Sequence, residues 1–148
     1  MTNLARRALA EEDLSSVEVW FGEAETQRWL GDTTWPRRLL ELARLPHRTT
    51  LLFTQADEPV ALLDLERNGD GSASIAIVVA PNHRRRGIAS AVVGSLFELD
   101  ETEEVVVVVG EVEHGNLAGE GLLRAAGFVQ TEGTSEGFTR YVLPVPRR

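Results

Sequence analysis

The chain has 148 residues but no cysteine and no lysine, so arginine supplies all 15 of its basic side chains. Without cysteine it has no disulfide, no thiolate metal ligand and no cysteine nucleophile. Without lysine it has no Schiff base on a lysine side chain and no Walker-type phosphate loop. The three histidines, His47, His83 and His114, are scattered along the chain. We therefore expect no metal site.

Long hydrophobic runs are also missing. The run of valines Val105–Val109 is far too short to cross a bilayer, and Met1–Ala10 lacks the apolar core of a signal peptide. A net charge of −8 repels the phosphates of nucleic acids and of anionic lipids. We therefore expect a cytoplasmic protein that binds neither nucleic acid nor membranes. With 43% hydrophobic residues, the chain can form one domain over residues 1–148.

The first third of the chain predicts an edge strand and two helices. Ala5–Leu9 is short enough for an edge strand. Glu11–Asp13 then places acidic side chains where a helix dipole favours them, ahead of apolar residues at helical spacing. Proline suits the first turn of a helix, so Trp35-Pro36 predicts the start of the second one.

Three β-rich runs follow, Thr49–Gln55, Val60–Glu66 and Ser72–Val79. Residues 56–59 form a turn signal between the first two runs. Asn68–Gly71 is a stronger hairpin signal between the second and the third.

The second half of the chain alternates helices and strands, in the order β-α-α-β-β-β-α-β-α-β-β for the whole sequence. This order predicts an α/β protein with a mixed sheet and helices on both faces. The expected elements are a helix over Gly87–Leu99, a strand over Val105–Val109 that is buried on both faces and continues to Glu113, a helix over Leu117–Ala126 closed by Gly127, and strands Phe128–Glu132 and Phe138–Leu143 around Gly133–Gly137.

A strand, a turn rich in arginine and a helix follow one another without a break in residues 77–89. The first N–H groups of a helix have no partner within the helix, and the helix dipole adds positive charge there, so a phosphate fits at this position. Gly87 allows close approach of the backbone, and the arginines add countercharge. The alternative is a solvated charged turn, and the turn by itself leaves that choice open.

The sequence Arg84-Arg85-Arg86-Gly87-Ile88-Ala89 resembles the R/Q-x-x-G-x-G/A acyl-coenzyme A signature of the GNAT superfamily of N-acetyltransferases. A second segment of this sequence also resembles an element of that family. The residues that match are Asn116, Leu122, Ala126, Gly127 and Phe128. Both motifs stand in the family's order on the expected strand–helix–strand–helix frame, and the resemblance covers essentially the whole chain.

The resemblance implies an acetyl-CoA co-substrate, no metal, and two central strands that splay apart around the pantetheine arm. Arg124 would reach a phosphate or remain a surface side chain. The residues that the resemblance assigns to the co-substrate are Ile77, Val78 and Val79 for the pantetheine, Arg84, Arg85, Arg86, Gly87, Ile88 and Ala89 for the pyrophosphate, and Asn116 near the thioester.

The sequence departs from the family at three places. The tyrosine that usually protonates the departing thiolate falls at Leu123, which has no proton to donate. Gly119 occupies a position that is usually alanine or serine, and the strand over Ser74–Val79 lacks the acid that many relatives carry there. The acid–base residues must therefore be sought elsewhere in the chain.

Glu111 is the favoured base and Glu113 the second choice, because they lie two residues apart, on one face of the valine strand near the expected splay. Partial desolvation by that strand would raise the pKa of either carboxyl. The alternative is that both glutamates are surface acids at the end of a strand with no role in catalysis. His114 is a further candidate for the base, or else a solvated loop residue. Tyr141 is a replacement proton donor or a buried tyrosine of the hairpin.

Four aromatic side chains in the first two helices and their connection are candidates for an acceptor site, with nearby acids. Such rings and carboxylates suit a cationic amine, although aromatic residues at this spacing also form cores. The residues are Trp20, Phe21, Trp29 and Trp35, with Glu18, Glu23, Glu25 and Asp32.

The resemblance thus implies an N-acetyltransferase that acts on a primary amine, either a cationic small molecule or a protein N-terminus. A non-catalytic acyl-CoA-binding module of the same fold is the alternative, suggested by Leu123 and the few acid–base groups. An interaction protein with a decayed cofactor site is disfavoured by the intact turn over residues 84–89. A homodimer is common among such proteins, but no feature of this sequence decides it.

Overall fold

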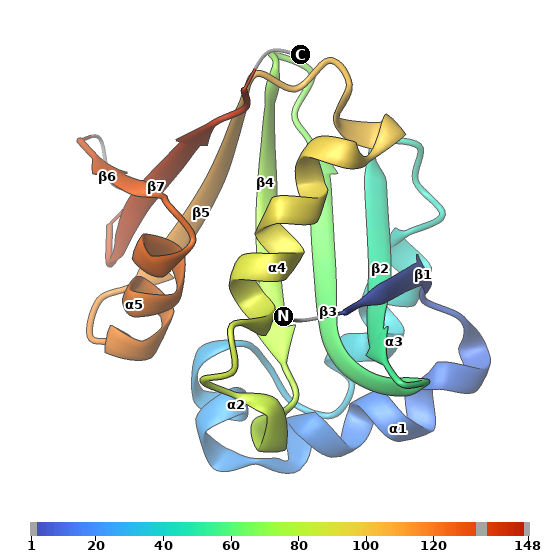
Figure 1. Cartoon of the computed structure of the whole chain (residues 1–148). Coiled ribbons are helices and arrows are strands. Elements are labelled where there is room, and N and C mark those ends of the chain that lie inside the picture. Colours follow the sequence, from blue (N-terminus) through green and yellow to red (C-terminus); the bar gives the residue numbers. More distant parts are fainter. Residues whose placement is uncertain (1–2, 133–135, 147–148) are drawn as a thin grey trace.

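The computed structural model describes residues 3–132 and 136–146, which form a seven-stranded sheet in the order β1-β2-β3-β4-β5-β7-β6 (Figure 1). Every neighbouring pair is antiparallel except β4 and β5, which are parallel, so the sheet is mixed as predicted. Part of the loop expected around residues 133–137 lies outside the described residues. The strands are β1 (Ala5–Ala8), β2 (Arg48–Gln55), β3 (Glu58–Arg67), β4 (Ser72–Val79), β5 (Val107–Glu113), β6 (Val129–Thr131) and β7 (Phe138–Pro144).

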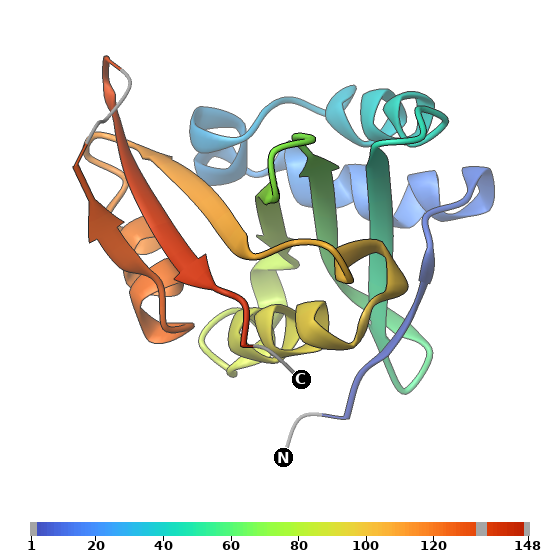
Figure 2. The ribbon, with the colours of Figure 1, turned by 90° about the horizontal axis from the view of Figure 1, so that it is seen from above.

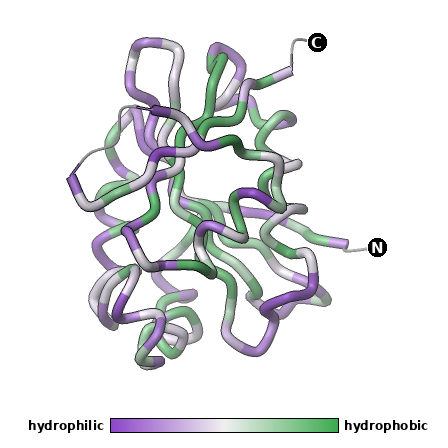
Figure 3. The backbone as a smooth tube through the Cα atoms, turned by 90° about the vertical axis from the view of Figure 1, so that its left-hand side faces the viewer, coloured by the Kyte–Doolittle hydropathy of each residue, from purple (hydrophilic) through white to green (hydrophobic). Residues whose placement is uncertain are grey.

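Helices cover both faces of the sheet, which confirms the predicted layers (Figure 2). α4 (Ile88–Ser95) and α5 (Leu117–Ala125) pack on one face, where Leu63, Val108 and other side chains form the larger core cluster. α1 (Leu14–Glu18) and α3 (Trp35–Leu42) pack on the other face. The strands in the middle are mainly hydrophobic and the loops at their ends mainly hydrophilic (Figure 3).

The short helix α2 (Ala24–Trp29) is absent from the predicted order. The chain leaves the turn that follows α1 at Gly22, and Glu23 adopts an extended conformation with φ −81° and ψ 135° before α2 begins. Only Thr26 among its residues is buried. α2 therefore has no hydrophobic stripe by which sequence periodicity could reveal it.

The central strands β4 and β5 separate soon after they begin. They pair only from Ser72 to Ser74 on β4 and from Val107 to Val109 on β5. Beyond these pairs β4 follows β3, and β5 follows β7, so the two strands diverge (Figure 1). The splay expected from the family resemblance is confirmed.

The valine run differs from the prediction of a strand buried on both faces. β5 begins at Val107 rather than at Val105, and Val106 is 42% exposed. Val108 is fully buried in the core cluster on the face that α4 and α5 cover, whereas Val107 and Val109 on the opposite face are half-buried. Only one face of this part of the sheet is closely covered by a helix.

Candidate functional site

The loop between β4 and α4 has the backbone of an anion-binding turn. Arg85 and Gly87 both have positive φ, of 63° and 77°. Gly87 is the N-cap of α4, no side chain caps this end of the helix, and the space where a Cβ would stand on Gly87 is open. A positive φ at a non-glycine residue such as Arg85 is costly, and such residues are enriched at functional sites. The loop thus presents uncapped N–H groups to an open space, as a bound phosphate requires.

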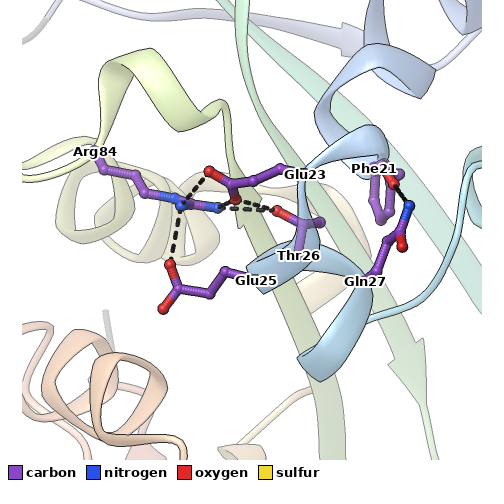
Figure 4. Close-up of polar contacts among 6 residues, drawn as sticks. All are labelled: Phe21, Glu23, Glu25, Thr26, Gln27 and Arg84. Carbon is purple, nitrogen blue, oxygen red and sulfur yellow. Dashed lines mark hydrogen bonds and ion pairs between the residues drawn. The ribbon is translucent and has the colours of Figure 1, made fainter.

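The side chain of Arg84 is directed to α2 (Figure 4). Its guanidinium donates to both carboxylate oxygens of Glu23, at 2.8 and 3.1 Å, and to the hydroxyl of Thr26 at 2.9 Å. The Glu25 carboxylate lies 3.4 Å away. Burial acts to raise the pKa of Glu23, but hydrogen bonds from Arg84 and Thr26 outweigh it and hold the pKa below its ordinary value.

This contact changes the expected source of countercharge for a phosphate. The Arg84 guanidinium is engaged by the acids of α2, while its backbone stays in the loop. Arg85 and Arg86 have exposed side chains. The positive charge that can meet a phosphate here is therefore carried by Arg85 and Arg86.

His83 anchors the start of the loop and was not among the predicted site residues. Its side chain is 9% exposed, and Nε2 lies 2.9 Å from a carboxylate oxygen of Glu58 on β3. Nδ1 is buried and has no hydrogen-bond partner among the described residues. The pairing joins two residues that are 25 positions apart, and nothing in the local sequence pattern indicates it.

The second half of β4 lies beside the splay. Val78 and Val79 are buried on opposite faces of the sheet, against the α1–α3 layer and the α4–α5 layer respectively, and Ile77 is half-buried. The parallel ladder with β5 has already ended at Ser74. The backbone edge of residues 77–79 that faces β5 is therefore outside that ladder, as the binding of an extended pantetheine arm requires.

Asn116 is the N-cap of α5, and its side-chain oxygen accepts a hydrogen bond from the N–H of Gly119 at 3.0 Å. A Cβ on Gly119 would lie 2.7 Å from Nδ2 of Asn116, so the glycine makes room for this cap. Leu123 packs closely on β5, because its Cδ1 lies 2.9 Å from the position of a Cβ on Gly110. The first contact explains the glycine at position 119, and the second shows that Leu123 has a packing role against β5.

Glu111 and Glu113 lie on the same face of β5, opposite to α5, as predicted from their spacing. Both side chains are exposed. The desolvation expected from the valine strand is therefore absent, and Glu111 lies opposite Arg140 in the β5–β7 register. Their roles in proton transfer stay predictions.

Tyr141 is fully buried on the face of β7 that packs on α5. Its hydroxyl donates to a carboxylate oxygen of Glu120 at 2.9 Å. The guanidinium of Arg124 lies over the tyrosine ring, 5.6 Å from its centre. The structure thus engages both the hydroxyl and the ring of Tyr141 within the β7–α5 packing, and it does not bring Tyr141 together with Glu111.

The aromatic residues predicted for an acceptor site divide into two groups. Trp20 and Phe21 are buried in the core, and the ring centres of Phe21 and Trp35 are 5.2 Å apart. Trp29 is half-buried, and the Arg28 guanidinium lies 4.6 Å from the centre of its ring. Of the four rings, Trp29 on α2 is the one that lies outside the core packing and near the candidate site.

A half-buried acid that the sequence patterns missed lies on the same sheet face as Glu111. Asp64 on β3 accepts a hydrogen bond from Arg48 at 2.8 Å, and it lies beside Ala76 of β4. Burial raises its pKa above the ordinary value, although Arg48 opposes this. In an alternating strand such an acid is expected to point to solvent, so the pattern gave no signal.

Two further properties concern the described residues as a whole. No group of three or more histidine, aspartate or glutamate side chains in residues 3–132 and 136–146 is arranged to hold a metal ion. Within the same part of the chain, no helix has the length and apolar character needed to cross a membrane.

Comparison with known proteins gives a consistent result. Residues 14–128 match the family model described as "Acetyltransferase (GNAT) family". A search of curated protein sequences finds no significant match. The fold is similar to that of an aminoglycoside acetyltransferase, AAC(6')-Ib, in complex with coenzyme A, with a TM-score of 0.79 at 17% identity over 96% of this chain and 95% of that one.

Two other solved structures have the same fold. One is a spermidine N-acetyltransferase from Vibrio cholerae in complex with CoA and spermine, with a TM-score of 0.77, 17% identity, and coverage of 96% and 95% of the two chains. The other is the ribosomal-protein-S18-alanine N-acetyltransferase from Escherichia coli, with a TM-score of 0.70, 20% identity, and coverage of 99% and 96%.

Proposed function

Because the chain belongs to the acetyltransferase (GNAT) family, we propose that it transfers an acetyl group from acetyl-CoA to a primary amine. The observation that carries this proposal is the uncapped loop over residues 84–89 at the side of splayed strands β4 and β5. The loop fits a pyrophosphate, and the splay fits an extended pantetheine arm. Ile77, Val78 and Val79 would line that arm.

The acceptor that we propose is cationic. The proteins of similar fold are named for the acetylation of aminoglycosides, of spermidine and of the alanine of a ribosomal protein, so the acceptors in their names are small amines and a protein. The net charge of −8 supports a cation, which such a field attracts in a salt-dependent manner. The small molecule and the protein N-terminus both remain within this class.

In the proposed mechanism the amine attacks directly, without a covalent enzyme intermediate. Acetyl-CoA, when bound, supplies an acetyl group activated as a thioester. An N–H of the backbone near Val79 would stabilise negative charge on the acyl oxygen. Glu111 would take a proton from the acceptor ammonium, with Glu113 as the second choice. Asn116 would lie near the acyl end of the site.

Protonation of the departing thiolate is assigned to water. Leu123 has no acidic proton, and the hydroxyl of Tyr141 donates to Glu120. A thiolate is a stable leaving group and can be protonated after it departs.

A non-catalytic acyl-CoA-binding module is the second candidate. It is favoured by Leu123, which replaces the usual acid with a side chain packed on Gly110. The two candidates share the cofactor site and differ only in turnover.

The experiment that separates them measures thiol release from acetyl-CoA with a panel of amines, containing polyamines, aminoglycosides and peptides with free N-termini. We expect thiol release that depends on the amine. In a separate binding measurement, the double variant Arg85→Gln, Arg86→Gln should bind CoA about tenfold or more weakly, because it loses two contacts to phosphate. Arg44→Gln, an exposed arginine after α3, is the matched control. CoA binding without turnover for any amine would favour the binding module, and equal affinity in the double variant would overturn the assignment of the loop.

A further inference from the structure

Helix α2 contacts both sides of the splay at its open end. On one side Glu23, which precedes the helix, and Thr26 bind the Arg84 guanidinium of the loop before α4. On the other side the ring of Trp29 lies against the turn between β5 and α5, with Cη2 3.8 Å from the position of a Cβ on Gly115. Figure 1 shows α2 at the end where β4 and β5 are far apart.

The attachment of α2 depends on these contacts. The helix has six residues, which is too short to be stable without tertiary contacts. Thr26 is its one buried residue, and the Thr26 hydroxyl, which donates to Glu23 at 2.8 Å, accepts from Arg84. The remaining polar anchor in this segment is the Gln27 side chain, which donates to the carbonyl of Phe21 at 2.8 Å (Figure 4). The position of α2 is therefore set largely by Arg84.

Arg84 by itself connects α2 to the candidate phosphate site. Its backbone belongs to the loop that includes Arg85 and Gly87, both with positive φ, and its side chain ends on Glu23. A ligand that fixes the backbone of the loop therefore also fixes the Cα and Cβ atoms of Arg84. Charge works in the same direction, because the guanidinium neutralises Glu23 beside a site that is to accept phosphates.

We propose that α2 is a strap across the open end of the splay, and that Arg84 is the positioning residue that tightens it when the loop binds the phosphates of CoA. This inference rests on the proposed function, since it uses the same cofactor site. In the bound state α2 holds Trp29 and Glu25 over the end of the site through which an acceptor amine enters. The acceptor surface is then complete only after the cofactor has bound.

Hydrogen–deuterium exchange of the whole chain, with and without CoA, tests the strap. CoA is expected to protect the loop over residues 84–91 and also α2 over residues 24–29. In α2 we expect exchange to slow about fivefold, which is about 1 kcal/mol at 1.4 kcal/mol per factor of ten and suits a partly exposed ion-pair network. In Arg84→Gln and in Glu23→Gln the loop is still protected by CoA, but α2 no longer responds.

Three further variants distinguish the strap from a purely structural ion pair. Arg84→Lys keeps one contact to Glu23 and should restore part of the response of α2 to CoA. Arg86→Gln removes the same charge from the same loop, at an exposed side chain for which the described part of the chain offers no ion pair. This variant should weaken CoA binding while α2 still responds at saturating CoA. The double variant Arg84→Gln, Glu23→Gln should behave like either single variant, because both remove one contact.

Each result has a separate meaning. CoA protection of the loop with no change in α2 would overturn the strap and leave the proposed function intact. Faster exchange of α2 in Arg84→Gln by the same factor with and without CoA would show a structural ion pair only, and would also overturn the strap. No protection by CoA at any position would overturn the proposed function together with the strap.

Discussion

The N-terminal half of α5 offers a matched pair of glycine substitutions whose effects on stability should differ. Gly121 is exposed and has no atom within 4 Å of the position of an added Cβ. Gly119 is enclosed, with Nδ2 of Asn116 at 2.7 Å and Cγ1 of Val112 at 3.2 Å from that position. Both glycines lie inside the helix, so alanine at either position gains the same helix propensity.

The magnitudes follow from these surroundings. Gly121→Ala should stabilise the chain by about 0.5–1 kcal/mol, because alanine loses less backbone entropy on folding. Gly119→Ala gains the same amount, but its methyl group forces the Asn116 side chain away and breaks the 3.0 Å cap to the N–H of residue 119. Loss of such a cap costs about 1 kcal/mol, and the contact with Val112 adds to it. The two variants should therefore differ by about 1 kcal/mol or more.

Thermal unfolding followed by circular dichroism measures this difference. For a chain of this size we expect the Tm of Gly121→Ala to exceed that of Gly119→Ala by about 2–4 °C. CoA affinity should fall in Gly119→Ala, where Asn116 has moved, and stay at the original value in Gly121→Ala. Equal Tm shifts in the two variants would refute the account of Asn116 as a cap that requires glycine at position 119.

The remaining predictions concern two carboxylates. Hydrogen bonds from Arg7, at 2.6 and 2.8 Å, are the main cause of the lowered pKa of Asp13. The stability that results is present above the ordinary pKa of aspartate and is lost as the pH falls through the pKa of Asp13 in the folded state. Asp13→Asn should therefore lower the Tm by about 2–4 °C at pH 7 and by much less at pH 3. A Tm difference that does not depend on pH would contradict this assignment. Glu111→Gln should lower kcat by about 100-fold or more at saturating acetyl-CoA, with Glu104→Gln, at an exposed acid ahead of β5, as the matched control. Unchanged kinetics in Glu111→Gln would remove Glu111 from its role.

Local signals were sufficient for most of the fold. The hairpin between β3 and β4 follows from Asn68–Gly71, where Gly69 and Gly71 adopt φ values of 82° and 90°. α5 ends where Gly127, with φ 100°, was expected to close it. These features are encoded by residues within a few positions of one another, so a single sequence can reveal them.

The contacts that shape the candidate site were not accessible in this way. Arg84 and Glu23 are 61 positions apart, and Tyr141 and Glu120 are 21 apart. A run of three arginines indicates positive charge but not which guanidinium is engaged by an acid elsewhere. The exposure of Glu111 likewise depends on which face of β5 lacks a helix, a property of the packed layers and not of the strand.

The most direct test of the central claim is to follow the acetyl group itself. Acetyl-CoA labelled with carbon-13 in the acetyl group is incubated with the protein and the amine panel, and the products are identified by mass spectrometry and NMR. The account predicts that the label appears on an amine nitrogen as an amide, in a protein-dependent manner. Label that appears only as free acetate, or stays on the cofactor with every amine while CoA binds tightly, would contradict it.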